Sequence, residues 1–217
     1  MLKLKVNKAD MILYVVTDRT WLGKSSLLEQ VEDIIKSGAT FIQLREKDLS
    51  FDEFVKTAKE IKSITDKYKV PFIINDNVDV AVAVDADGVH IGQSDEEIKT
   101  AREKLSAYKI IGVSAHSVQE AIKAQQNGAD YIGVGAVFNT TTKTDANIVS
   151  LEVLKDICNT IKIPVVAIGG ISKDNIIKLS GSGVDGVAVI SAVFTQLDIS
   201  KATRELLQLS KQMMNAQ

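Results

Sequence analysis

A short phrase recurs along this chain and restricts the folds that it can adopt. Its clearest copies are Gly38-Ala39-Thr40-Phe41-Ile42 and Gly128-Ala129-Asp130-Tyr131-Ile132, and further copies begin at Gly183 and, more loosely, at Asp85. A glycine just past a helix supplies a left-handed residue, and the apolar run after it is typical of a buried parallel strand. The recurrence therefore predicts a repeated βα unit.

Eight apolar runs of strand length lie along the chain, with helix starts between them. No linker rich in Pro, Gly or Ser divides residues 1–217, so we expect a single domain. Eight alternating βα units at this length predict an α/β fold, a (β/α)₈ TIM barrel, with a doubly wound sheet as the alternative. The predicted strands are 12–17, 41–45, 72–75, 88–91, 110–114, 131–135, 165–168 and 186–190, and the expected capping boxes join Ser50 to Glu53, Ser94 to Glu97 and Ser117 to Glu120.

The sequence of residues 78–85 is compatible with either a strand or a helix. Four valines alternate there with alanine and aspartate, which taken alone predicts a strand. A barrel, however, needs a crossover between the strands at 72–75 and 88–91, and parallel neighbours require a connection of about a dozen residues that is usually helical. We therefore expect a short helix.

Composition narrows the class of protein. The chain has 217 residues, of which 45% are hydrophobic and 25% charged, which is typical of a globular protein. Its formal charge of −2 provides no overall positive potential that would attract nucleic acid. The one cysteine, Cys158, allows no internal disulfide and is expected to be a small buried thiol. No apolar run approaches a signal peptide or a membrane span of about 18 residues, so we expect a cytoplasmic enzyme.

Polar side chains alternate with apolar ones in the second predicted strand. Gln43, Arg45 and Lys47 share one face of the run that starts at Phe41, and that face is not a core face. Two cations and an amide at one strand end would form a site for an oxyanion such as phosphate. A solvated strand end is the alternative. The other strand ends favour the anion site, because seven of the eight carry polar side chains.

Two acidic residues follow consecutive predicted strands. Asp76 and Asp95 could converge on one hard cation, because Mg²⁺ is commonly held by one or two carboxylates together with substrate phosphate oxygens. The alternative for Asp76 is an Asx turn, and the alternative for Asp95 is an acid that complements a helix dipole.

The last strand ends suggest a second anion site. Gly169 and Gly170 lie between a strand and a helix start, where glycine lets backbone N–H groups approach a phosphate. Ser191 ends the final strand, and the ends of strands seven and eight form the recurrent phosphate site of TIM barrels. The polar loop 138–146 lies between the two proposed sites.

Only two histidines are present. His90 is expected to pack within a strand. His116 lies just beyond the fifth strand and is a candidate catalytic base, although the other strand ends supply no obvious partner for it.

Together these residues resemble the thiamine-phosphate synthase family, over nearly the whole chain and in the expected order. The motifs are Tyr14-x-x-Thr17-Asp18, Gln43-Leu-Arg-Glu-Lys47, Asn75-Asp76, His90-Ile-Gly-Gln93-x-Asp95, Gly112-Val-Ser-Ala-His116, Thr140-x-Thr142-Lys143, Ala167-Ile-Gly-Gly170 and Val189-Ile-Ser191.

The resemblance implies a transferase that joins hydroxymethylpyrimidine diphosphate to hydroxyethylthiazole phosphate and releases pyrophosphate. It assigns the pyrimidine diphosphate to Gln43, Leu44, Arg45, Glu46, Lys47, Asn75, Ser114 and Lys143, of which Arg45, Lys47, Ser114 and Lys143 are expected to be catalytic. It assigns Mg²⁺ to Asp76 and Asp95, and the thiazole phosphate to Thr140, Thr141, Thr142, Gly170, Ile190 and Ser191.

Two other functions stay open. A thiazole tautomerase resembles the synthase but transfers a proton with a histidine, and a non-catalytic barrel would bind a phosphorylated ligand without turnover. Arg45, Lys47, Asp76, Asp95 and Lys143 favour the synthase, because a tautomerase has no pyrophosphate to hold. We expect small-molecule substrates and neither nucleic acid nor a membrane as partner. The sequence leaves open a homo-oligomer, the kinetics, the order of substrate binding and a carboxylated thiazole as acceptor.

Overall fold

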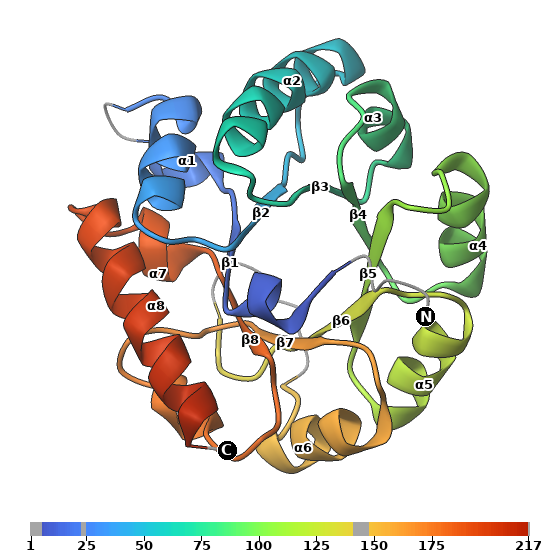
Figure 1. Cartoon of the computed structure of the whole chain (residues 1–217), viewed down its shortest axis with the longest axis vertical. Coiled ribbons are helices and arrows are strands. Elements are labelled where there is room, and N and C mark those ends of the chain that lie inside the picture. The colour runs from blue at the N-terminus through green and yellow to red at the C-terminus, as the bar shows by residue number, and fades with distance from the viewer. Residues whose placement is uncertain (1–5, 23–24, 141–147, 217) are drawn as a thin grey trace.

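Eight parallel strands pair in chain order and close into a barrel, with β1 pairing to both β2 and β8. The computed structural model describes residues 6–22, 25–140 and 148–216, apart from the side chains of residues 95 and 96. Helices surround the barrel on its outside (Figure 1). The strands are β1 Leu13–Val16, β2 Phe41–Leu44, β3 Phe72–Asn75, β4 Gly88–Ile91, β5 Ile110–Ala115, β6 Tyr131–Val134, β7 Val165–Ile168 and β8 Gly186–Val189.

The predicted barrel is confirmed, and its closure excludes the doubly wound sheet. Residues 78–85 contain a helix, as the crossover argument requires, because the strand pattern there is overridden by the need to connect two parallel neighbours. The α-helices are α1 Leu27–Lys36, α2 Phe51–Tyr68, α3 Val78–Ala83, α4 Asp95–Lys104, α5 Val118–Gln126, α6 Leu151–Thr160, α7 Ser191–Phe194 and α8 Ile199–Asn215, and the 3₁₀ helices are η1 Lys8–Met11, η2 Arg19–Trp21 and η3 Ile176–Leu179. No helix in these ranges is long and apolar enough to cross a bilayer.

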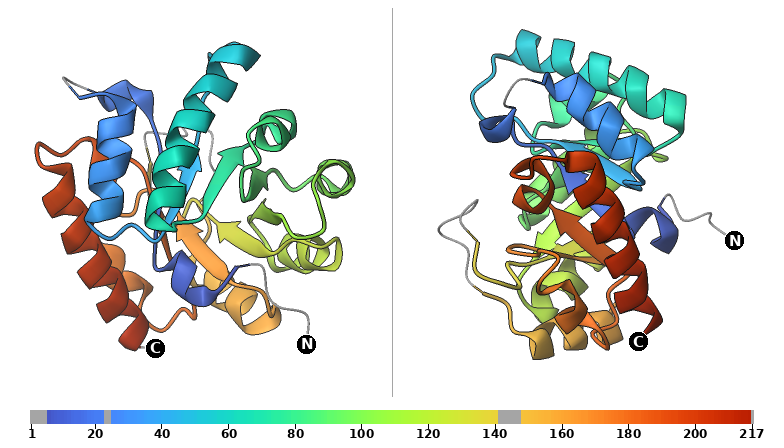
Figure 2. Two further views of the ribbon diagram at one scale, coloured as in Figure 1. Left: turned by 45° about the horizontal axis from the view of Figure 1, so that its top comes forward. Right: turned by 90° about the vertical axis from the view of Figure 1, so that its left-hand side faces the viewer.

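The crossover from β7 to β8 differs from the prediction. The expected helix after Gly170 is replaced by η3, a single short 3₁₀ segment. Glycines at 169 and 170 precede the segment and glycines at 181 and 183 follow it, all with positive φ that a right-handed helix cannot include, so only a short stretch between them could be helical. Helix α8 covers this side by packing on η3 and α1, and it lies alongside α1 in Figure 2.

One of the three expected capping boxes is complete. Ser50 and Glu53 exchange both hydrogen bonds at the start of α2. Ser94 and Ser117 accept from the backbone N–H groups of Glu97 and Glu120, but no reciprocal bond forms among the described residues. The Glu120 carboxylate accepts from the His116 N–H instead, and Glu97 lines a cavity described below.

The core has two layers. Alternate strand residues fill the barrel interior, among them Tyr14, Phe41 and Tyr131, whereas the other set packs between the barrel and the helices. Helix η1 and Met11 close the amino end of the barrel; η1 is the dark-blue turn that crosses it in Figure 1. The opposite, carboxyl end of the barrel is where the predicted site residues lie.

The recurrent phrase of the sequence has a specific structural role. Its polar residue precedes an even-numbered strand and exchanges two hydrogen bonds with a residue at the start of the strand before it, which is the first or second residue of that strand. Asp130, for example, donates its backbone N–H to Ile111 O at 2.7 Å and accepts the Ile111 N–H on Oδ2 at 2.8 Å. The same exchange joins Thr40 to Leu13, Asp87 to Phe72 and Asp185 to Val165.

Candidate active site

Side chains from the ends of β2 and β3 form a hydrogen-bonded chain. The Gln43 amide donates to Asn75 Oδ1 at 3.1 Å, and Asn75 Nδ2 donates to Asp76 Oδ2 at 2.6 Å. Gln43 is buried, whereas Asp76 is exposed. The chain fixes both amides and ends on a carboxylate that solvent and ligands can reach.

The backbone of Asp76 is in the left-handed region, with φ of +60°. Its N–H donates to His90 O at 2.8 Å, which ties the loop after β3 to β4. A non-glycine residue in this region costs about 1–3 kcal/mol, and such residues concentrate at functional sites. The placement of this carboxylate is therefore maintained against a local preference.

Arg45 and Lys47 follow directly after β2. The Arg45 N–H donates to Oγ1 of Thr17, the buried residue that follows β1, at 3.1 Å, and the Thr17 N–H donates to Gln43 O at 2.9 Å. The backbone that carries the two cations is thereby fixed. Neither side chain takes part in an ion pair or hydrogen bond with another described residue. Two such cations suit an anionic ligand.

The side chain of Glu46, between these cations, forms an ion pair, and its predicted substrate contact stays a prediction. Its carboxylate is 4% exposed and pairs with Arg19 Nε at 2.5 Å, while Arg19 Nη2 donates to Thr57 Oγ1 at 3.2 Å. Burial raises the pKa of the Glu46 carboxyl group, and Arg19 acts against that rise. The pair ties the loop after β2 to η2 and α2. Leu44 is also predicted to contact substrate. Its side chain is buried between the barrel and the helices, so such a contact would have to come from its backbone.

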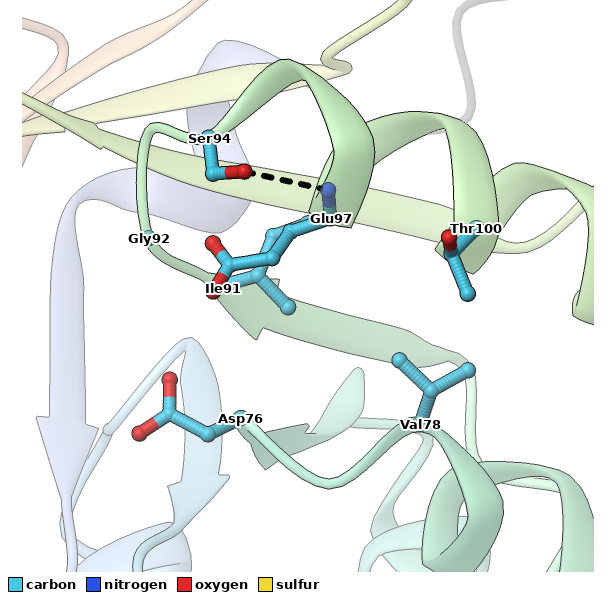
Figure 3. Close-up of a pocket in the computed structure, with 7 residues that line it drawn as sticks. All are labelled: Asp76, Val78, Ile91, Gly92, Ser94, Glu97 and Thr100. Atoms are coloured by element: carbon cyan, nitrogen blue, oxygen red, sulfur yellow. Dashed lines mark hydrogen bonds between the residues drawn. The ribbon is translucent and has the colours of Figure 1, made fainter.

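A cavity of about 370 Å³ lies beside the ends of β3 and β4 (Figure 3). Asp76 borders it on one side and Glu97 on the other. A Cβ built on Gly92 would come within 2.9 Å of Glu97 Oε2, so glycine here makes room for that carboxylate. Helix α4 begins at Asp95, the other predicted metal ligand, whose side chain lies outside the description.

Ser114 is half-buried in β5 and joins a hydrogen-bonded chain inside the barrel. Its Oγ lies 3.0 Å from His90 Nε2, and His90 Nδ1 lies 2.8 Å from Tyr131 Oη. Burial raises the pKa of the Tyr131 hydroxyl well above its ordinary value, so that hydroxyl stays protonated. His90 lies in β4 as expected, with polar partners at both ring nitrogens.

His116, the candidate base, lies near a carboxylate. Its backbone N–H donates to Glu120 Oε2 at 2.7 Å, and its Nδ1 is 3.3 Å from the same oxygen. The Gln93 side chain faces Glu120 as well, with its amide nitrogen as the donor. This contact explains why Glu120 does not complete the capping box of α5.

Gly170 follows β7 with φ of +66°, and a Cβ there would lie 2.2 Å from the carbonyl oxygen of Asn139. Its own carbonyl accepts from Asn175 Nδ2 at 2.9 Å, and Asn175 Oδ1 accepts from the Ser172 N–H at 2.8 Å. Close packing against the loop after β6 therefore requires glycine here. A phosphate contact through the Gly170 N–H stays a prediction.

The remaining predicted contacts belong to the ends of β6 and β8. Ile190 lies at the junction of β8 and α7, and Ser191 is the first residue of that short helix. Both are half-buried, as is Thr140 on the loop after β6. Thr141, Thr142 and Lys143 lie outside the described residues.

The sequence assigned no role to the tyrosines of the barrel interior. Tyr14 Oη lies 2.8 Å from Tyr131 Oη, which continues the Ser114–His90 chain into the core. A sign of it was present, since a tyrosine on the buried face of an otherwise aliphatic strand must find a partner for its hydroxyl. The pairing of Arg19 with Glu46 had no local sign in the sequence either, because the two residues lie 27 positions apart.

Comparison with known proteins gives a consistent picture. The thiamine monophosphate synthase family matches residues 13–193. A thiamine-phosphate synthase of Clostridium acetobutylicum is 50% identical over 206 residues, which is 95% of this chain and 98% of that protein. One from Clostridium tetani is 50% identical over 91% of this chain and 94% of its own.

Solved structures agree with the sequence relatives. A thiamine phosphate pyrophosphorylase from Pyrococcus furiosus is 43% identical, with a TM-score of 0.87, over 95% of this chain and 98% of its own. A geranylgeranylglyceryl phosphate synthase from Thermoplasma acidophilum, 17% identical with a TM-score of 0.70 over 98% of this chain and 99% of its own, shares the fold alone. The family match and the identity over nearly the full length leave one assignment: the chain belongs to the thiamine monophosphate synthase family.

Proposed function

We propose that this chain is a thiamine-phosphate synthase, a transferase that joins hydroxymethylpyrimidine diphosphate to hydroxyethylthiazole phosphate and releases pyrophosphate. The observation that carries the proposal is at the carboxyl end of β2 and β3. There Arg45 and Lys47 form no ion pair with another described residue, and the hydrogen-bonded chain on the neighbouring strand ends on Asp76. An anion with a bound cation complements that arrangement.

The pyrimidine diphosphate belongs at this end of the barrel. Arg45 and Lys47, together with Lys143, would bind the diphosphate oxygens, because guanidinium and ammonium groups form strong charge-assisted hydrogen bonds with phosphate. Gln43 and Asn75 present amide groups, fixed by their mutual hydrogen bond, to the polar edge of the pyrimidine. Ser114 lies on the neighbouring side of the site.

Asp76 and Asp95 are proposed to hold Mg²⁺ with the diphosphate. The donor set fits the ion: Asp76 is an exposed carboxylate next to a cavity, and Asp95 is the first residue of the helix opposite. The described residues contain no group of three His, Cys, Asp or Glu side chains placed for a metal, and Mg²⁺ bound through substrate oxygens and water needs only one or two carboxylates. When bound, the ion neutralises charge that develops on the diphosphate.

The thiazole phosphate is proposed to bind across the ends of β6, β7 and β8. A short extra helix, α7, starts at Ser191, and the ends of strands seven and eight with such a helix form the recurrent phosphate site of this fold. Gly170, Ile190, Ser191 and the residues from Thr140 to Thr142 would surround that phosphate.

The chain's residues act mainly by electrostatics and orientation. The bond between the pyrimidine methylene carbon and the diphosphate oxygen breaks, and pyrophosphate leaves with the electron pair. Arg45, Lys47 and Lys143 stabilise the charge that develops on this leaving group. The electron-rich aminopyrimidine carries the methylene cation until the thiazole nitrogen lone pair forms the new C–N bond. No base is needed, since that nitrogen carries no proton.

Proton transfer by His116, as in a tautomerase, is the alternative that one observation favours. A carboxylate beside an imidazole could orient a base, and Glu120 lies 3.3 Å from His116 Nδ1. His116→Ala tests this directly. We expect the coupling rate to stay near wild type. A loss of about a thousandfold, which is on the scale of acid–base catalysis, would favour the tautomerase function instead.

The experiment for the main proposal measures pyrophosphate release and the joined product with both substrates and Mg²⁺. Release should require all three, and Arg45→Ala should abolish most of it. Binding of both ligands by calorimetry without product would show a non-catalytic barrel. Conversion of a thiazole phosphate isomer without pyrophosphate release would show a tautomerase.

A further inference from the structure

A line of hydrogen bonds crosses the barrel interior and joins four strands. Tyr14 Oη on β1 lies 2.8 Å from Tyr131 Oη on β6, Tyr131 Oη lies 2.8 Å from His90 Nδ1 on β4, and His90 Nε2 lies 3.0 Å from Ser114 Oγ on β5. The proposed reaction uses only Ser114. The other three side chains are polar groups inside the barrel core whose purpose the reaction does not explain.

The direction of this line decides what Ser114 can do. A hydroxyl has one proton to donate, and a neutral imidazole donates from one nitrogen while it accepts at the other. Burial raises the pKa of both tyrosines, so both hydroxyls keep their protons. We call the carboxyl end of the barrel its mouth and the amino end its floor. When every member is neutral, each side chain donates its proton to the next, either all toward the mouth or all toward the floor.

The two directions differ in where the last proton points. If the line ran toward the floor, that proton would be on Tyr14, which is 2% exposed and packs on the Phe41 ring at 4.7 Å between centroids. Among the described residues Tyr131 is the only hydrogen-bond partner of Tyr14 Oη, so the proton would lack an acceptor. A buried donor without an acceptor is strongly unfavourable. If the line runs toward the mouth, every interior proton has an acceptor and the last one is on half-buried Ser114.

We propose that the line is polarised toward the mouth, with Tyr14 donating to Tyr131, Tyr131 donating to His90 Nδ1, and His90 Nε2–H donating to Ser114 Oγ. Ser114 then presents its own proton to the substrate, and it selects an acceptor atom there rather than an amino group. His90 and Tyr131 are positioning residues that act through Ser114. The role of Ser114 toward substrate rests on the proposed function, whereas the polarity of the line does not.

The tautomer of His90 tests the polarity without any substrate. The chain has two histidines, so His116→Ala leaves His90 as the only imidazole in a ¹⁵N NMR spectrum. We expect a proton on Nε2 and a bare Nδ1. A proton on Nδ1 would overturn the proposal, whatever activity the protein has, because His90 would then accept from Ser114.

Kinetics test the action through Ser114. Tyr131→Phe removes the donor to His90 Nδ1 and should lower kcat/KM by about tenfold, which equals about 1.4 kcal/mol. In a Ser114→Ala background the same substitution should lower it no further, since the two act in series. Tyr14→Phe is the matched variant: it removes a donor to Tyr131 but no acceptor, so its loss should be clearly smaller.

Two kinetic results would contradict the proposal. Equal losses for Tyr14→Phe and Tyr131→Phe would mean that the line runs toward the floor, where Tyr14 is the required acceptor. An undiminished loss for Tyr131→Phe in the Ser114→Ala background would mean that Tyr131 acts by packing alone. Thermal unfolding of each variant separates lost fold from lost positioning, and the NMR measurement stays decisive if Tyr131→Phe does not fold.

Discussion

The two ends of the barrel use the same residue types for opposite purposes. At the amino end, Asp87, Asp130 and Asp185 each accept a backbone N–H from the neighbouring strand, at 2.8–2.9 Å. At the carboxyl end, Asp76 accepts one bond from Asn75 and stays exposed, with its backbone in the left-handed region. The amino-end carboxylates complete the sheet, whereas the carboxyl-end carboxylate bonds to a side-chain amide and stays open to solvent.

This difference follows from where each aspartate lies relative to its strand. A carboxylate just before a strand reaches the free N–H of the adjacent strand, whose partner would otherwise be missing at the edge of the ladder. A carboxylate just after a strand meets carbonyl groups, with which it cannot bond. It must turn to donors from elsewhere, and a ligand with a bound cation can take that place. We therefore expect mutations at the two ends to separate stability from activity.

The largest effect is expected at Asp76. Asp76→Asn keeps the shape of the side chain, and asparagine tolerates the left-handed backbone, so the fold should be unchanged. Loss of the charge at the proposed Mg²⁺ site should lower the rate by about 10²–10³, or roughly 3–4 kcal/mol. The measurement is coupling activity against Mg²⁺ concentration, where excess Mg²⁺ should partly restore the variant.

Two comparisons sharpen that test. Asp95→Asn should behave like Asp76→Asn, and the double variant should lose less than the product of the two losses, because either change disables the same ion. Arg45→Ala should lose activity without any rescue by Mg²⁺. Metal curves identical to wild type in the two Asn variants would leave Asp76 as a turn residue and Asp95 as a helix-start acid.

Gly170→Val should be the next largest effect, because it perturbs the loop after β6 as well as the backbone. A β-branched residue at φ of +66° is strained, and its Cβ would meet the Asn139 carbonyl. We expect weaker thiazole-phosphate binding and a nearly unchanged affinity for pyrimidine diphosphate, both measured by calorimetry.

Gly181→Val is the matched control for that substitution. Gly181 has φ of +76°, but a Cβ there has nothing within 4 Å, so the control carries the backbone strain without the contact. It should lower stability and leave both affinities near wild type. Equal losses of both ligands in Gly170→Val would mean that the two phosphate sites are misassigned.

At the amino end the effect should fall on stability alone. Asp87→Ala leaves the N–H of fully buried Phe72 without its acceptor, which should lower the free energy of unfolding by about 1–3 kcal/mol. Asp87→Asn keeps an acceptor oxygen and should lose less. Denaturant unfolding gives the stability, and kcat below the melting transition should match wild type. A fall in kcat with unchanged stability would contradict the assignment of stability to the amino end and activity to the carboxyl end.

The sequence predicted the barrel because its constraints are local or topological. The run at 72–75 and the run at 88–91 had to be parallel neighbours, so the valines between them had to form a helix, α3. The recurrent phrase identified the repeat through Asp130 and its counterparts, although the hydrogen bond that gives the aspartate its purpose joins residues 19 apart.

The features that the sequence did not predict depend on contacts between distant strands. Tyr14 and Tyr131 meet only because the barrel closes, 117 residues apart. Glu120 forms a local cap by its backbone, yet its carboxylate turns to His116 and Gln93, a choice that the spacing alone could not decide. Gly170 was identified, but the Asn139 carbonyl that requires glycine there is supplied by another crossover.

The smallest effect is expected at Cys158, which lies on the amino-end side against Gly183 and near Asp185. Burial, together with the Asp185 charge, raises the pKa of this thiol to about 12, and Lys8 lowers it. At pH 8 the thiolate fraction is then about 10⁻⁴, compared with about 0.2 for an ordinary cysteine, so alkylation of the folded protein should be about 10³ slower than that of the unfolded chain. Asp185→Asn keeps an acceptor for the Val165 N–H but removes the charge, so it should speed alkylation, whereas Lys8→Gln should slow it further. The measurement is the rate of alkylation by iodoacetamide, which reports on Cys158 alone because it is the only cysteine of the chain. Native and unfolded rates that agree, or two variants that shift the rate in the same direction, would contradict this account of the amino end.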